Sequence, residues 1–299
     1  MTSEQYQVVT DSALLLAGYP EFGIYQFDLN NNYTIPNYPA VRSPTNEITF
    51  RQAIAHMVDK NWIVSDVLKG FGERIDVPIG AAIMGYANES VIGGNYPYPY
   101  NLTRTAELLD IHFADTDLDG IRNYPVGWPG RKSGPNLDPI ISLIVDYKYK
   151  GAAGQALVNN MQILGIPVEE ITDPFIIHFV LESAQYYIYT GAWGLGRYPT
   201  YLWNLFHSDN WYSSGSNYVT GMNSSNLPNY PDLDDVLEDV YYAEDNDAFK
   251  NAVKKATGLL VEYCVDIPLF SLKYWMAYRK NLAGIVNMDG YGWRTLTCS

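Results

Sequence analysis

Residues 50–72 read FRQAIAHMVDKNWIVSDVLKGFG and predict two helices with a short break between them. Apolar residues recur there every three or four positions, the spacing that places side chains on one face of a helix. The polar triplet 59–61 interrupts this pattern, and Gly70 ends the second helix. The apolar positions are Ile48, Phe50, Ile54, Met57 and Val58 in the first helix and Ile63, Val64, Val67 and Leu68 in the second.

Helices and strands alternate along the rest of the chain, without internal repeats. Thr45 or Asn46 is expected to cap the first helix, with Glu47 in its first turn. This order predicts a mixed α/β fold, and no long linker divides residues 1–299 into separate domains. Strands near both ends suggest that the termini leave from neighbouring positions in one sheet. The predicted strands are 24–29, 140–146, 166–171, 175–181, 185–193 and 267–286 (one strand or a pair), and the further helices are 101–111, 154–164, a short one after Pro199, 232–243 and 246–263.

Composition limits the partners of this chain. The formal net charge is −14, which argues against a nucleic-acid partner and against docking on an anionic membrane. No apolar segment approaches membrane-spanning length, and residues 1–23 do not resemble a signal peptide, so we expect the natural N-terminus to lie outside this sequence. Glycosylation sequons favour export of the protein; they begin at Asn32, Asn88, Asn101 and Asn223.

The two cysteines exclude some kinds of site. They are Cys264, in an apolar run that predicts burial, and Cys298, next to the C-terminus. Whether they form a disulfide stays open, because the sequence does not set their separation. No Cys-X-X-Cys pair is present, which excludes a zinc ribbon and a dithiol redox motif.

One acidic segment matches the start of a calcium-binding loop. Asp115, Asp117 and Asp119 alternate and precede Gly120, so their carboxylates could converge on a hard cation, and Asn123 could add a ninth-position ligand. The twelfth position, where a bidentate Glu is expected, is Val126. The residues therefore leave two readings, a calcium ion or a solvated Asp/Gly turn, and the missing ligand favours the turn.

No motif predicts catalysis. The histidines lack the spacing of a metal pair on one helix, and His178 is expected in the middle of a strand. Neither a Gly-X-Ser-X-Gly elbow nor a phosphate-binding loop is present. The adjacent pairs 169–170 and 234–235 point in different directions, so neither forms an acid/base couple. The sequence therefore predicts a protein that is not an enzyme and requires no cofactor.

The aromatic stretch 193–208, WGLGRYPTYLWNLFHS, is the candidate binding site. It reads as a loop leaving a strand, followed by a short helix. Flat aromatic side chains stack on sugars, peptide side chains or planar groups, while Arg197 suits a carboxylate. The alternatives are a loop that caps the core and a structural ion pair for Arg197. The predicted ligand-binding residues are Trp193, Arg197, Tyr198, Tyr201 and Trp203.

Six segments together resemble a known family. Residues 50–72 resemble the R-Q-A-x-x-x-x-x-D-(K/R)-x-x-(I/V) helix of the extracytoplasmic solute-binding proteins of family 5, which serve ABC importers for peptides, nickel and some oligosaccharides. The upstream strand IYQFDLNN resembles the strand that leads into this helix. The matching helix positions are Arg51, Gln52, Ala53, Asp59, Lys60 and Ile63, and the later similar segments are 98–110, 115–123, 228–245 and 261–285.

This resemblance covers about residues 24–290 and implies a type II periplasmic-binding-protein lobe, a mixed sheet flanked by helices. Full family members are much longer than 299 residues, so the chain is expected to be the second (C-terminal) lobe, with hinge strands near 24–30 and 267–285. The implied function is solute capture. The implied partners are a small solute such as a peptide and the importer's membrane subunits. The expected location is extracytoplasmic, at the cell surface or in the periplasm, with membrane association through an anchor outside this sequence, and the fragment is expected to be a monomer.

Residue Arg197 departs from the family pattern. The stretch resembles the family's W-x-A-D-Y-P-D-P loop, whose first Asp pairs with the amine of a bound peptide. Arg197 stands in that place before Tyr198, and Thr200 replaces the second Asp. We therefore expect Arg197 to face an anionic or hydroxyl-rich group. The alternatives are a carbohydrate-acting enzyme or a glycan-binding module that uses the aromatic cleft, and a surface module whose aromatic side chains contact a partner lobe.

Overall fold

A mixed sheet organises the protein. The computed structural model describes residues 13–131, 134–145, 149–211, 217, 220–222, 230–282 and 285–295. Within them the strand order is β1-β7-β2-β6-β4-β5, with β3 pairing β7, and β8 and β9 form a separate hairpin. Strand β6 is antiparallel to β2 and parallel to β4. The strands are β1 Leu14–Pro20, β2 Ile24–Leu29, β3 Gly72–Arg74, β4 Ile140–Leu143, β5 Val168–Ile171, β6 Ile188–Trp193, β7 Asp266–Arg279, β8 Ile285–Met288 and β9 Gly292–Thr295.

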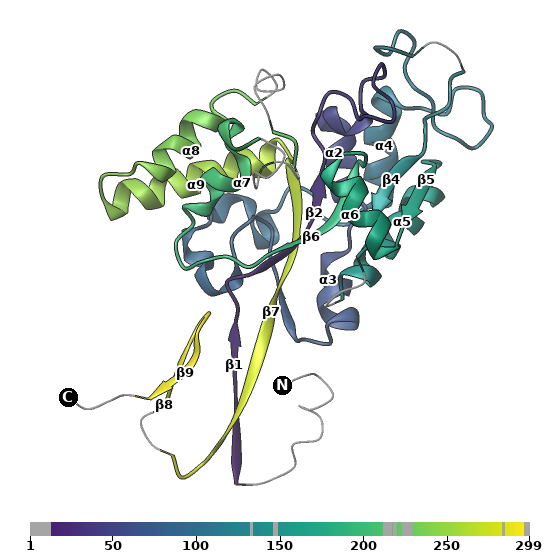
Figure 1. The fold of residues 1–299 in the computed structure, drawn as a ribbon. Coiled ribbons are helices and arrows are strands. Elements are labelled where there is room, and N and C mark those ends of the chain that lie inside the picture. The colour runs from purple at the N-terminus through teal and green to yellow at the C-terminus, as the bar shows by residue number, and fades with distance from the viewer. Residues whose placement is uncertain are drawn as a thin grey trace.

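Helices cover this sheet as the sequence predicts. In Figure 1, α8 and α9 lie on one side of β7, and α2, α4, α5 and α6 lie on the other. The mixed α/β architecture, a mixed sheet flanked by helices, is confirmed. The α-helices are α2 Ile48–His56, α3 Lys60–Trp62, which continues as a π-helical turn Ile63–Val67, α4 Leu102–His112, α5 Lys150–Ile163, α6 Pro174–Glu182, α7 Tyr201–Phe206, α8 Leu233–Tyr241 and α9 Asn246–Glu262.

Strand β7 is long enough to join two parts of the structure. Its first half pairs with β2 and β3 inside the helical body. Its second half pairs with β1, with Tyr19 opposite Tyr274 and Leu14 opposite Arg279. Figure 1 shows β1 and β7 leaving the helices together as a ribbon. Strands near the two ends of the chain are thus neighbours in one sheet, as expected.

A buried guanidinium ties α2 to the end of α9. Arg51 is 1% exposed and donates from Nη1 to Thr45 O at 2.8 Å, from Nη2 to Tyr263 O at 2.8 Å and from Nε to Cys264 O at 2.9 Å. The ring of Tyr230 lies 5.4 Å from the guanidinium carbon. These carbonyls lie at helix and turn ends, where no backbone N–H is in place to hydrogen-bond them. The guanidinium of Arg51 supplies the missing donors in a fixed geometry.

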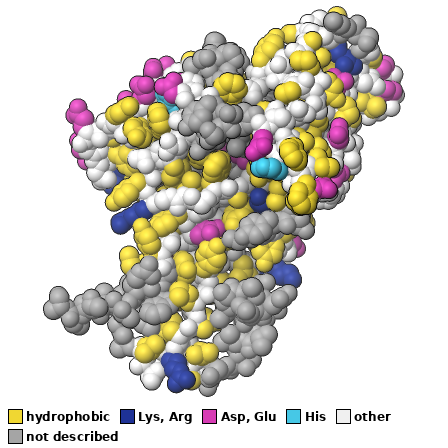
Figure 2. Space-filling model, in the orientation of Figure 1, with side chains coloured by type: hydrophobic (Ala, Val, Ile, Leu, Met, Phe, Trp, Pro, Cys, Tyr) yellow, Lys and Arg dark blue, Asp and Glu magenta, His cyan; other side chains and the backbone are white. Residues whose placement is uncertain are grey.

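The predicted strand at 175–181 is wrong, because these residues form helix α6. Asp173 caps this helix by accepting from Phe175 N at 2.8 Å, and Pro174 takes its first turn, where a missing N–H costs nothing. His178 therefore lies on a helix, with Nε2 3.3 Å from Glu182 Oε1. Apolar side chains gather over α6 on the face seen in Figure 2; the exposed ones are Phe175, Ile176 and Phe179.

The predicted caps of α2 are also wrong. Residues 44–46 form a 3₁₀ turn, and the Thr45 and Asn46 side chains donate to the carbonyls of Asn30 and Asn31 instead. The backbone carbonyls that follow β2, 15 residues earlier in the chain, compete for those side chains. By contrast, the predicted helix 101–111 has a side-chain cap from its own first residue, since Asn101 caps α4 by accepting from Arg104 N at 2.9 Å.

Some sequence predictions miss elements or fall outside the described residues. Strands β1, β3, β8 and β9 lacked a clear signal, because short or ribbon strands carry little alternation. Cys264 is buried as predicted, with a free thiol, whereas Cys298 and Asn223 lie outside the described residues.

We predict that Arg51→Met lowers the free energy of unfolding by about 3 kcal/mol, because it leaves buried carbonyls without donors. The measurement is equilibrium urea denaturation. The control is Arg104→Met on α4, whose ion pair with Glu107 is about half exposed, and its expected cost is under about 0.5 kcal/mol. Equal midpoints for the two variants would contradict this role for Arg51.

Candidate functional site

Trp193 lies where β6 leaves the sheet, beside the start of the ribbon. It is partly buried and lines a hollow of about 420 Å³ together with the turn that joins β1 to β2. The hollow has an aromatic wall and one carboxylate, Glu21, whose Oε1 accepts from Leu272 N at 3.1 Å. Its lining includes Tyr19, Glu21, Phe22, Tyr25, Trp193 and Tyr274.

Arg197 lines a second hollow, of about 510 Å³, which shares Phe22 with the first. Lys250 of α9 adds a second cation there, and Asp289 of the β8–β9 turn adds a carboxylate. Arg197 is exposed, and its guanidinium carbon lies 5.6 Å from the ring of Tyr198. Among the described residues Arg197 has no ion-pair partner within 4.0 Å, so the structure gives no support to a structural ion pair.

The remaining predicted binding residues do not all reach these hollows. Tyr198 is 56% exposed beside Arg197. Tyr201 is 9% exposed and donates its hydroxyl to Pro78 O at 3.3 Å. Trp203 stacks between His207 and Tyr241, at centroid distances of 5.2 and 4.8 Å. The last two side chains pack α7 onto its neighbours, so the structure unites only Trp193, Arg197 and Tyr198 around the loop.

A buried acidic cluster lies on strands β2 and β7, and no sequence motif indicated it. Asp28 of β2 and Asp266 of β7 face each other across the two strands and are 1% and 5% exposed. Gln26 donates from Nε2 to Asp28 Oδ1. One oxygen of each of these three side chains is buried without a hydrogen-bond partner among the described residues: Gln26 Oε1, Asp28 Oδ2 and Asp266 Oδ2.

Burial raises the pKa of the Asp28 carboxyl to about 7, although the side chains of Gln26, Lys150 and Trp193 favour its ionised form. Burial and the facing Asp28 also raise the pKa of Asp266. Lys150 donates from Nζ to Thr190 O at 2.8 Å, and burial lowers its pKa. The cluster thus places two carboxyls that resist ionisation beside one buried lysine.

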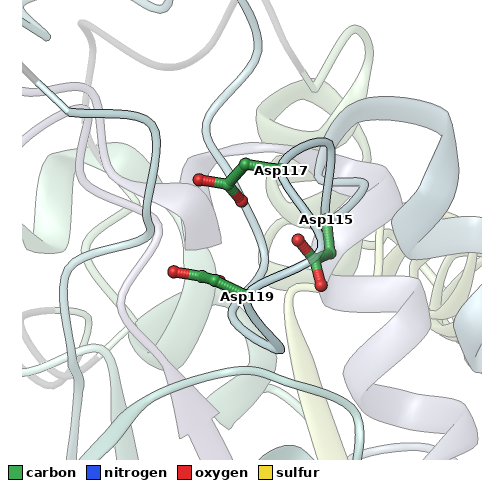
Figure 3. A group of neighbouring side chains, drawn as sticks. All are labelled: Asp115, Asp117 and Asp119. Atoms are coloured by element: carbon green, nitrogen blue, oxygen red, sulfur yellow. The ribbon is translucent and has the colours of Figure 1, made fainter.

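The acidic loop brings its three aspartates together. One oxygen each of Asp115, Asp117 and Asp119 lies within 4.8 Å of the others, on one turn of the loop (Figure 3). Asp115 Oδ2 accepts from Gly120 N at 2.9 Å, and Oδ1 is a buried atom without a partner among the described residues. Asn123 Oδ1 already accepts from Thr116 N and Oγ1, so it braces the loop.

Comparison with known proteins decides the family. The sequence profile of the bacterial extracellular solute-binding proteins, family 5 (middle region), matches residues 2–213. The chain belongs to this family. No curated protein matches the sequence.

Solved structures share the fold of this family 5 chain. HbpA2 from Haemophilus parasuis matches with a TM-score of 0.73 and 17% identity, over 97% of this chain and 50% of that one. The oligopeptide-binding protein AppA from Bacillus subtilis, in complex with a nonapeptide, matches with a TM-score of 0.69 and 17% identity, over 99% of this chain and 55% of AppA. MelB from Agrobacterium fabrum, in complex with stachyose, matches with a TM-score of 0.70 and 19% identity, over 93% of this chain and 42% of MelB. The chain therefore spans about half the length of these proteins.

These findings confirm the family and the fold class expected from the sequence. In the part of the chain that the structure describes, every helix is too short or too polar to span a membrane.

We predict that the stability advantage of Asp28→Asn over the wild type grows as pH rises. The pKa of Asp28 is raised in the folded state, so its contribution to stability is fully present below about pH 4 and is lost as pH rises through about 7. Urea denaturation of both proteins at pH 4.5 and pH 8 measures this advantage as a difference in the free energy of unfolding. We expect the advantage to grow between the two pH values by at most about 4 kcal/mol. The control variant Asp239→Asn, at an exposed position, should differ from the wild type by the same amount at both pH values. The prediction is wrong if the difference in unfolding free energy between Asp28→Asn and the wild type is the same at pH 4.5 and pH 8.

Proposed function

We propose that this chain is the second lobe of a solute-binding protein that delivers a solute to an ABC importer. The observation that carries the proposal is the position of Trp193 and Arg197, in two adjoining hollows beside the ribbon of β1 and β7. Ligand sites commonly lie between domains, and hinged domains close over their ligands. A solute bound in these two hollows would contact the side chains of the loop 193–199.

The hinge belongs to this proposal. We infer that β2 and β7, which contain most of the residues expected near 24–30 and 267–285, form this hinge; β7 extends from the helical body into the ribbon. A first lobe outside the given sequence would then cover the ribbon and the open side of the hollows. A lone lobe would bind solute weakly, because closure buries the solute from both sides.

Charge narrows the class of solute. Arg197 and Lys250 line one hollow, while Glu21 and several aromatic side chains line the other. Guanidinium groups bind carboxylates with two parallel hydrogen bonds, and aromatic walls take apolar side chains. A peptide or related solute with an anionic or hydroxyl-rich group at Arg197 fits both hollows.

The remaining partners follow from the family. We infer an extracytoplasmic location, importer membrane subunits as the protein partner, and membrane association through a part outside this sequence. The fragment is expected to be a monomer that binds no nucleic acid and catalyses no reaction.

A glycan-binding module is the second candidate, since the aromatic wall also suits sugar rings. A carbohydrate-acting enzyme needs two carboxylates on either side of one bond. Among the described residues, Glu21 lines one hollow and Asp289 the other, so each hollow has a single carboxylate there, which favours binding over hydrolysis.

We predict that the two-lobe parent protein prefers acidic over cationic peptides, and that Arg197→Ala reduces affinity for acidic peptides at least about tenfold, as expected for a lost charge-assisted bond. Isothermal titration measures both affinities. Arg104→Ala, on exposed α4, is the matched control and should leave them unchanged. A preference for a free amino terminus that survives Arg197→Ala would rule out this role.

We also propose that Asp115, Asp117 and Asp119 hold a calcium ion. Three carboxylates on one tight turn, with Asp115 Oδ1 lacking a partner among the described residues, suit a hard cation that binds oxygen. Hydrogen bonds from backbone N–H groups, above all that of Gly120, outweigh burial and lower the pKa of Asp115, so the carboxylate is ready for a cation.

We predict that millimolar CaCl₂ raises the melting temperature of the protein, because an ion that binds only the folded state stabilises it. Differential scanning calorimetry in CaCl₂ and in EDTA measures the shift, and MgCl₂ controls for ionic strength. Asp117→Asn should abolish the shift, whereas Asp239→Asn should keep it. Equal melting temperatures in CaCl₂ and EDTA would contradict a calcium site.

A further inference from the structure

A third hollow, of about 310 Å³, lies where the start of α3 meets α5. It shares no lining residue with the two hollows beside the loop 193–199. Small-molecule sites occupy about 300–1,000 Å³, so this hollow is large enough for a small ligand. Its floor is apolar and almost fully buried, with Met57, Ile63, Ala153 and Leu157 each at most 2% exposed.

Two aromatic rings line this hollow and remain exposed to solvent. Trp62 of α3 is 38% exposed, and Tyr100, which precedes α4, is 44% exposed. In the part of the chain that the structure describes, neither ring packs against another aromatic ring or lies against a cationic side chain. The face of an aromatic ring carries partial negative charge and attracts cations. Both rings are therefore available to a cationic ligand.

Asp59 gives the hollow its charge. It is partly buried, and its Oδ1 accepts from Trp62 N at 2.9 Å, which caps α3. Among the described residues its carboxylate forms no ion pair. The neighbouring Lys60 is directed elsewhere, since its Nζ lies 3.1 Å from Asp76 Oδ1 and 3.8 Å from the centre of the Tyr96 ring. Asp59 is thus an anion beside an apolar floor, without a counter-ion from the described chain.

The other polar side chains of the hollow are neutral. Asn160 Nδ2 donates to Met57 O at 2.8 Å, so the amide oxygen stays available to accept a hydrogen bond. The described residues that line the hollow include one carboxylate and neither Lys nor Arg. This hollow therefore favours a cation, whereas Arg197 and Lys250 bring two positive charges to the larger hollow at the loop.

We propose that this third hollow is a second ligand site that binds an organic ammonium ion, with the cation against Asp59 and the rings of Trp62 and Tyr100 and its apolar body on the floor. A carboxylate and aromatic faces attract the same ammonium group, and the floor buries the carbon atoms attached to it. A neutral apolar ligand would cover the carboxylate without pairing it, which costs free energy, and an anion would be repelled. The site has its own residues and does not depend on the solute cleft.

The test uses 2-phenylethylammonium as the probe, with neutral 2-phenylethanol and anionic 3-phenylpropionate as probes of similar shape. Isothermal titration of the 299-residue chain measures each affinity. We expect the ammonium probe to bind at least about tenfold more tightly than the alcohol, as expected for a charge-assisted contact. Nuclear magnetic resonance of the ¹⁵N-labelled indoles locates the site. The Trp62 signal, identified among the seven tryptophans by its loss in Trp62→Phe, should shift with the ammonium probe.

Two variants and a matched control test the residues. Asp59→Asn removes the charge and keeps an oxygen that can cap α3, so it should fold and lose at least about tenfold in affinity for the ammonium probe, with the alcohol unchanged. Tyr100→Leu keeps an apolar side chain on the loop before α4 and should lose about threefold, the value of one cation–π contact. Asp66→Asn removes the same charge at an exposed position outside the hollow and should change neither affinity.

Several results would overturn the proposal. They are no binding of the ammonium probe, equal affinity for the ammonium and the alcohol, an ammonium affinity that Asp59→Asn and Tyr100→Leu leave unchanged, and a Trp62 signal that stays constant while the ammonium binds. None of them bears on the solute cleft, which the affinity for acidic peptides tests separately.

Discussion

The helical body depends on the buried guanidinium of Arg51. Its donors connect the start of α2 to the turn that follows α9, segments separated by about two hundred residues in the chain. That turn begins β7 directly, so the same contact sets where β7 enters the sheet beside β2. Since β7 also forms the ribbon with β1, one buried polar contact fixes the origin of the strand that would connect two lobes.

Local signals made much of the fold predictable. Helices α8 and α9 carry apolar stripes, and α9 also has an aspartate cap, so the chain encodes them within a few turns. Segment 174–182 was predicted as a strand but forms a helix. It is apolar at nearly every position, so periodicity does not separate the two, and only the Asp173–Pro174 start indicates a helix. The side chains of Thr45 and Asn46 were misjudged for another reason: their partners are the carbonyls of Asn30 and Asn31 just after β2, whose place is fixed by tertiary contacts.

The candidate site also contains residues that local sequence identifies and residues that only tertiary packing reveals. Trp193 and Arg197 were found because aromatic and cationic residues cluster on one glycine-rich loop. Tyr201 and Trp203 share that stretch, but α7 turns them inward, and only the packing of α7 reveals this. The Asp28 cluster was invisible, because Gln26 and Asp28 of β2 and Asp266 of β7 come from strands far apart in the sequence. Only the cross-strand register, which the sequence does not state, brings these side chains together.

We propose that the loop after β6 forms one wall of a solute cleft beside the hinge. The decisive experiment is a crystal structure of the two-lobe parent protein grown with an acidic peptide. We expect density for the peptide against the ring of Trp193, with a carboxylate of the peptide within hydrogen-bond distance of the Arg197 guanidinium. Peptide density elsewhere on the protein, with Arg197 paired to a carboxylate of its own chain such as Asp289, would rule out this cleft wall.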